Sequence, residues 1–172
     1  GHGLLERQAQ IVPGRAPCGV LQRRLLLPGD RVHVDLDRRV LVDSSAIIAL
    51  LNRRDQNHRR ASLTWGGLAG KKALLLIPDY VLGEVVTYFK RFSFEGCRTA
   101  VERLGELHRS GIVEVVFPDG EAWTDAMSGV LVLPDPGYSM FDAVSVAFAR
   151  RERIPRVFSY DGVFSELGLP CP

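Results

Sequence analysis

The sequence is poor in cysteine, with Cys18, Cys97 and Cys171 as the only three in 172 residues. No two of them have the close spacing of a zinc-binding pair, and an odd, scattered set does not suit a disulfide framework. Such a set is typical of a reducing compartment. No apolar segment of the signal-peptide kind follows a basic start at the N-terminus. We therefore expect a cytoplasmic protein.

Long apolar runs, histidines and glycine-rich loops are also scarce. The longest apolar run, residues 73–77, is strand-sized, far short of the roughly 20 residues that a membrane helix needs, so we expect no membrane association. None of the four histidines falls near an expected strand end, which argues against a Ser-His-Asp triad. The glycines at 66, 67 and 70 follow an expected helix, whereas a phosphate-binding loop follows a strand.

The composition that remains is that of a globular protein with a core, since 46% of the residues are hydrophobic and 24% are charged. A net charge of +2 permits a nucleic-acid partner without arguing for one. Residues 1–39 are rich in Arg, Gly, Pro and Gln, and only the segment 31–37 alternates like a strand. We expect an N-terminal extension over 1–39, partly irregular with one edge strand or hairpin, and a second domain over 40–172.

From residue 40 onward, apolar strand patterns alternate with helical patterns. The expected strands cover residues 40–42, 73–77, 112–117 and 156–159. The expected helices cover residues 46–51, 58–68, 79–89, 95–110, 119–131, 141–151 and 162–167, the first capped by Ser44 or Ser45 and the third by Asp79. This order predicts an α/β fold with a mostly parallel sheet and helices on both faces. Ligands in such folds bind beyond the carboxyl ends of the strands.

Four acidic residues lie where that rule directs attention. Asp43 and Asp161 each follow an apolar strand, Asp142 lies at the start of an apolar helix, and Glu84 lies within one. Each has a structural alternative: Asp43 and Asp142 suit helix caps, Asp161 suits a turn, and Glu84 suits a solvent-facing position. Together they would converge on one crevice, where like charges repel unless a cation compensates them.

Hard carboxylate oxygens without a Cys or His cluster suit Mg²⁺ or Mn²⁺. One or two such ions can bind a phosphodiester oxygen, activate a water molecule and stabilise the leaving oxygen. The residues alone leave open which number applies.

Four motifs resemble those of PIN domains, in the order and spacing of small bacterial VapC-type toxins. They are Val-Leu-Val-Asp-Ser-Ser at 40–45, Pro-Asp-Tyr-Val-Leu-Gly-Glu at 78–84, Asp-x3-Ser-x2-Asp at 135–142 and Phe-Ser-Tyr-Asp at 158–161. The resemblance covers residues 40 to 169. It implies a three-layer α/β/α sandwich, Mg²⁺- or Mn²⁺-dependent cleavage of single-stranded RNA by metal-activated water, a homodimer and a cognate antitoxin.

Carried over by position, the resemblance makes Asp43, Glu84, Asp142 and Asp161 the catalytic, metal-binding acids, with Ser45, Ser139 and Ser159 as supporting hydroxyls. Basic residues after the first helix, Arg53, Arg54 and Arg59, either attract RNA phosphates or form a solvated helix end. Two alternatives to a toxin stay open: a housekeeping PIN-domain nuclease of RNA processing, and a non-catalytic scaffold that binds RNA or protein.

Overall fold

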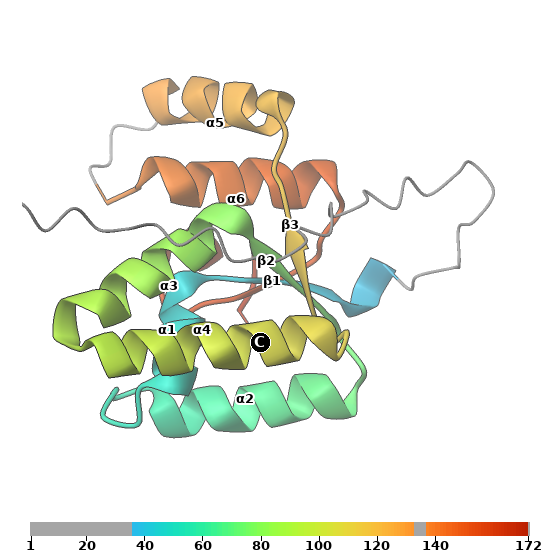
Figure 1. Ribbon diagram of the computed structural model, residues 1–172. Coiled ribbons are helices and arrows are strands. Elements are labelled where there is room, and N and C mark those ends of the chain that lie inside the picture. The colour runs from blue at the N-terminus through green and yellow to red at the C-terminus, as the bar shows by residue number, and fades with distance from the viewer. Residues whose placement is uncertain (1–35, 133–136, 172) are drawn as a thin grey trace, which may run out of the picture. The chain divides into compact units, whose positions relative to one another are not determined.

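The computed structural model describes residues 36–132 and 137–171, which form alternating strands and helices (Figure 1). After a 3-10 helix, Leu36–Arg38, the strands are β1 Arg39–Val42, β2 Leu74–Pro78, β3 Val113–Val116 and β4 Val157–Phe158. The helices are α1 Ser44–Leu51, α2 His58–Gly70, α3 Asp79–Phe92, α4 Phe94–Arg109, α5 Gly120–Val132, α6 Met140–Arg151 and α7 Val163–Glu166. Each expected strand and helix from residue 40 onward is present, with ends shifted by a few residues.

The four strands form one parallel sheet in the order β3-β2-β1-β4. Leu41 of β1 is paired with Leu76 on one side and Val157 on the other, so β1 lies at the centre between β2 and β4. Parallel neighbours require crossover connections, which the helices supply. The carboxyl ends of all four strands therefore point to the same edge of the sheet.

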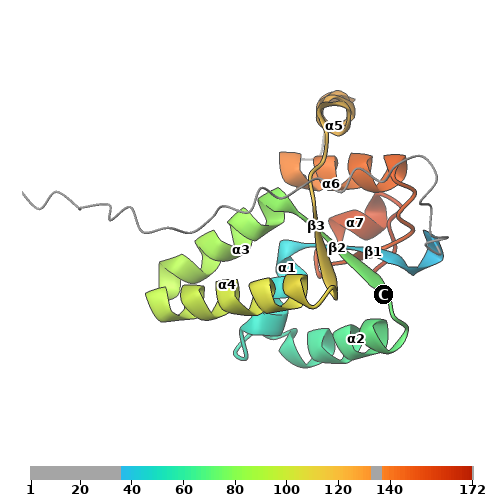
Figure 2. The same cartoon turned by 45° about the vertical axis from the view of Figure 1, so that its right-hand side comes forward.

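Both faces of the sheet are covered, because successive strand residues point to opposite faces. Val40 and Val42 of β1 belong to a buried cluster with residues of α1, α2 and α3, whereas Leu41 belongs to a second cluster with residues of α6 and α7. Helix α5 packs on α6, and Figures 1 and 2 show these two helices on the opposite side of the strands from α2. The expected α/β/α sandwich with a parallel sheet is confirmed.

Helix starts differ from expectation in two places. The expected cap of the first helix, Ser44 or Ser45, is wrong, and the structural alternative for Asp43 is confirmed: Asp43 is the N-cap of α1, because its carboxylate accepts the backbone N–H of Ser45. Helix α3 begins at Asp79 itself, after Pro78, and has no side-chain cap. Proline suits this place because its fixed φ ends the strand and it has no N–H to leave unpaired.

Much of the expected N-terminal extension lies outside the described residues, and so do residues 133–136 of the expected loop before α6. Of the alternating segment 31–37, the structure describes Leu36 and Asp37, which belong to the 3-10 helix and not to a strand. Within residues 36–132 and 137–171, none of the helices combines the length and the apolar character needed to cross a membrane.

Candidate functional site

The four predicted acids lie at the carboxyl edge of the sheet or on the helices that begin there. Asp43 directly follows β1, and Asp161 comes three residues after the end of β4. Glu84 is in the second turn of α3, which follows β2, and Asp142 is in the first turn of α6. The parallel sheet brings these elements together, although the residues are spread over most of the chain.

Asp43 is buried, with 8% of its surface exposed, and one of its oxygens is fully engaged. Oδ2 accepts hydrogen bonds from the Ser45 backbone N–H at 3.1 Å, the Ser45 hydroxyl at 2.6 Å and the Ser159 hydroxyl at 2.9 Å. Charge-assisted bonds of this kind are stronger than neutral ones. They orient the carboxylate, and the capping role and a ligand role are therefore compatible in one residue.

Ser159 joins two of the acids. Its hydroxyl donates to Asp43 Oδ2 and accepts the Asp161 backbone N–H at 2.9 Å, while only 4% of the residue is exposed. The Ser45 hydroxyl, 3.1 Å from that of Ser159, accepts the Tyr160 N–H at 2.9 Å. The loop after β4 is thereby tied to the start of α1, which sets the position of Asp161.

Asp142 is held by Ser139 in a capping box at the start of α6. Its Oδ2 accepts the Ser139 N–H at 2.9 Å and the Ser139 hydroxyl at 2.7 Å, and the Asp142 N–H donates back to that hydroxyl at 3.1 Å. A capping box satisfies the otherwise unpaired N–H groups of a first helical turn. It also fixes the carboxylate on the side of α6 where the other acids lie.

The acids act on one another electrostatically. The pKa of Glu84 is raised chiefly by burial, and the charges of Asp43 and Asp142 raise it further. A hydrogen bond from Ser44 acts in the opposite direction and lowers it. The pKa of Asp142 is likewise raised by burial, against its bonds with Ser139, and then by Asp43 and Asp161. Each of the four therefore lies within the electrostatic range of at least one other.

The donor chemistry of this acidic quartet, Asp43, Glu84, Asp142 and Asp161, fits a hard divalent cation. Four carboxylates supply oxygen ligands only, which Mg²⁺ and Mn²⁺ prefer. A cation would offset both the burial of charge and the repulsion between acids, which together raise the pKa values of Glu84 and Asp142. Among the side chains that the structure describes, no three His, Cys, Asp or Glu residues already form a closed ligand cluster. The fit therefore rests on donor type and charge.

The basic residues near the site divide into two groups. Arg53, Arg54 and Arg59 are exposed in the α1–α2 connection and the first turn of α2. Arg60, the next residue along α2, has its guanidinium carbon 5.4 Å from the ring centroid of Tyr160, beside Asp161. Ser44 was expected as a helix cap, and its bond to Glu84 was missed. Its position directly after Asp43 is the sequence signal for that role.

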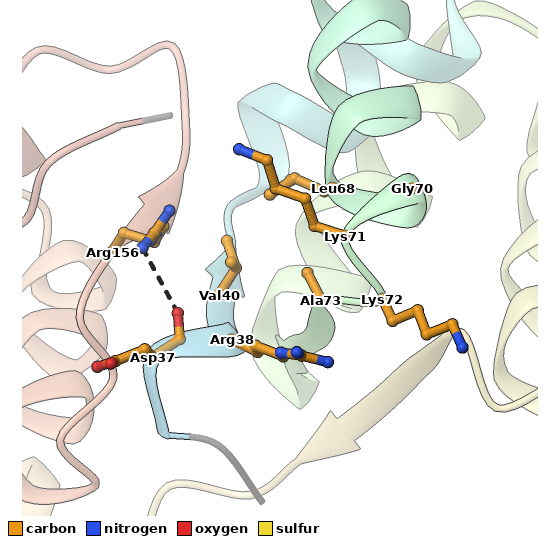
Figure 3. Close-up of a pocket in the computed structure, with 9 residues that line it drawn as sticks. All are labelled: Asp37, Arg38, Val40, Leu68, Gly70, Lys71, Lys72, Ala73 and Arg156. Atoms are coloured by element: carbon orange, nitrogen blue, oxygen red, sulfur yellow. Dashed lines mark hydrogen bonds between the residues drawn. The ribbon is translucent and has the colours of Figure 1, made fainter.

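A basic hollow lies at the opposite ends of the strands. It has a volume of about 610 Å³ and includes Arg38, Lys71, Lys72 and Arg156. Figure 3 shows Lys71 and Lys72 extending in different directions, and Arg156 donating to the Asp37 carbonyl at 3.4 Å. None of the four acids lines this hollow, so it is separate from the quartet.

Comparison with known proteins gives a family and a solved structure. The family model for the PIN domain matches residues 40–169. The crystal structure of the Mycobacterium tuberculosis toxin VapC20, described as cleaving the sarcin–ricin loop, is 29% identical. That match has a TM-score of 0.66 and covers 76% of this chain and 96% of the toxin chain. No curated protein sequence matches the chain significantly.

Proposed function

This chain belongs to the PIN-domain family, and we propose that it is a divalent-metal-dependent endoribonuclease that acts as the toxin of a toxin–antitoxin pair. PIN-domain nucleases are generally hydrolytic ribonucleases that use divalent metals. The observation that carries the proposal is the quartet: one carboxylate directly after β1, one on α3, one at the start of α6 and one in the loop after β4, at the carboxyl edge of a single parallel sheet.

We assign metal binding and catalysis to four acids: Asp43, Glu84, Asp142 and Asp161. When bound there, Mg²⁺ or Mn²⁺ supplies Lewis acidity, which lowers the pKa of a water molecule and offsets charge on a phosphodiester. Ser45, Ser159 and Ser139 are positioning residues under this proposal. The hydroxyls of Ser45 and Ser159 donate to one oxygen of Asp43, and that of Ser139 donates to one oxygen of Asp142. These hydrogen bonds orient both carboxylates before any ligand binds.

RNA as the substrate is supported by the relative. VapC20 is described as a toxin that cleaves the sarcin–ricin loop, and 96% of that chain aligns with this one. We extend RNA cleavage, a cognate antitoxin and homodimer formation to this chain, acting in the cytoplasm, with residues 40–172 as the nuclease domain and 1–39 as an extension. Arg53, Arg54 and Arg59 are exposed cations that suit contacts with RNA phosphates.

The test is cleavage of a labelled hairpin RNA that carries the sarcin–ricin loop. We expect the full chain to cut it with magnesium present and not with EDTA. Asp142→Asn should lose most of this activity, because a neutral amide is a weaker ligand for a hard cation. Asp125→Asn is the matched control, since Asp125 lies on α5 and pairs with Arg151 at 3.3 Å, away from the quartet. Full activity in folded Asp142→Asn protein would refute the assignment.

The toxin role has a test of its own. Brief expression of the chain in a bacterium, followed by mapping of new RNA 5′ ends, should yield a few recurrent cleavage sites and arrested growth. Expression of the Asp142→Asn variant should give neither result. Normal growth with an active wild-type enzyme would instead favour a housekeeping nuclease.

A further inference from the structure

A groove of about 650 Å³ runs beside Glu84. Its main wall is one face of α3, because residues spaced by three, four or seven positions share a helix face. The α3 residues are Tyr80, Gly83, Glu84, Thr87, Tyr88 and Arg91. Ile48 of α1 and Phe141 of α6 complete it. The groove thus passes an acid of the quartet, with Tyr80 before it along α3 and Arg91 after it.

Aromatic rings in the groove are held in fixed positions. Phe141, 38% exposed, stacks on Tyr80 with ring centroids 5.1 Å apart and an interplanar angle of 20°. The Tyr80 hydroxyl lies 2.7 Å from that of buried Ser145, and Trp123 meets both rings edge-on. The outer face of this stack is a preformed, apolar platform of the kind that nucleobases stack on.

Glycine at position 83 keeps the groove open. Gly83 lies in the interior of α3, where glycine costs about 1 kcal/mol relative to alanine. It is exposed, and a Cβ there would meet no atom within 4 Å, so close packing does not require a glycine. A long side chain at this position would stand beside Glu84 in the groove. The glycine therefore leaves the part of the groove beside Glu84 free of a side chain.

The charges and rings along the groove suit a chain of alternating anionic groups and planar rings. Glu84, with the proposed metal site, lies near the middle of the lining residues of α3. Exposed Arg91 lies two helical turns further along α3, roughly 10.5 Å away along the axis. Tyr88 lies between Glu84 and Arg91 along the helix, whereas Phe141 stacks on Tyr80, about one turn before Glu84. The Tyr88 hydroxyl is itself fixed, since it accepts a bond from the Asn52 side chain at 3.2 Å.

We propose that this α3 groove binds an unpaired nucleotide of the RNA strand next to the phosphate that is cut, with its base stacked on Phe141 and a neighbouring phosphate on Arg91. The inference rests on the proposed function. A second copy of this chain is a poorer occupant, because filling the groove with protein would cover Glu84 and remove it from the substrate.

The test compares Gly83→Gln and Phe141→Ala with the wild type, using the full chain and the sarcin–ricin hairpin RNA. RNA binding is measured by fluorescence anisotropy in EDTA, and cleavage kinetics are measured with magnesium. We expect each variant to weaken binding and to raise KM about tenfold, the effect of one base–aromatic stack, whereas Phe141→Trp retains both. Gly67→Gln is the matched control, because Gly67 is also exposed, inside α2, with no atom near its Cβ position.

The outcomes separate the two proposals. If the wild type cleaves RNA, and Gly83→Gln and Phe141→Ala bind RNA with the same affinity and the same KM as the wild type, the groove proposal alone is overturned. A wild type that neither binds nor cuts RNA would overturn the proposed function and the groove with it. Sedimentation measurements give a further check: a dimer that Gly83→Gln dissociates, with RNA binding unchanged, would assign the groove to a second copy and overturn the proposal.

Discussion

Ser159 offers a sharp test of how the acidic edge of the sheet is built. Its buried hydroxyl donates to the Asp43 carboxylate at 2.9 Å and accepts the Asp161 N–H at 2.9 Å. Replacing Ser159 with alanine removes both of these hydrogen bonds at once. Asp43, only 8% exposed, then keeps two of its three hydrogen bonds and has little access to water in place of the third.

The expected loss of stability follows from the charge of the acceptor. A hydrogen bond to a charged group contributes about 1.5–3 kcal/mol, against about 1 kcal/mol for a neutral pair. Because Ser159→Ala also leaves the Asp161 N–H without its acceptor, we expect the free energy of unfolding to fall by about 2–3 kcal/mol.

Urea unfolding in EDTA measures this loss, and Ser145→Ala is the matched control. Ser145 is as buried as Ser159, at 4% exposed, but its hydroxyl lies 2.7 Å from the neutral phenol of Tyr80 and not beside a carboxylate. We expect the control to lose about 1 kcal/mol. Equal losses in the two variants would refute the inference that Ser159 supports a buried carboxylate.

Three further changes test the site and the fold. Ser139→Ala should cost about 1 kcal/mol as a lost N-cap and lower RNA cleavage, because Asp142 loses its hydroxyl partner; unchanged cleavage kinetics would contradict this. Phe164→Ala empties a position with 0% exposure and should cost about 3–5 kcal/mol in urea unfolding, and a loss below 1 kcal/mol would mean that the core closes around the gap. Gly111→Ala places a side chain at φ +73° and should lower the free energy of unfolding by about 1 kcal/mol or more, unlike the same change at Gly67.

The layered fold was predictable because its signals are local. Short apolar runs such as residues 40–42 and 73–77 indicate buried strands, and helical periodicity between them indicates covering helices. The parallel order of such elements directs attention to the strand ends, which is how Asp43 and Asp161 were found. The PIN-domain motifs then supplied the layer count and the family, both of which are confirmed.

The connections within the site were less predictable because they join distant parts of the chain. Ser45 and Ser159 are 114 residues apart in sequence, and no local pattern links them. Ser159 was expected only as a supporting hydroxyl, and its direct bond to Asp43 depends on that distant pairing. Asp43 was considered as a cap or as a ligand, whereas its geometry allows both. The stacking of Phe141 on Tyr80 likewise depends on how α3 and α6 pack.

The most direct test of the central claim is a calorimetric titration of the RNA-free protein with Mn²⁺. Glu84→Gln is the variant of choice, because Glu84 is half-buried and caps no helix, so its loss should leave the fold intact. The wild type should bind Mn²⁺, and the variant should bind it at least about tenfold more weakly, within the range known for altered metal sites. Equal binding by the two proteins, or none by the wild type, would contradict a metal site at the acidic quartet.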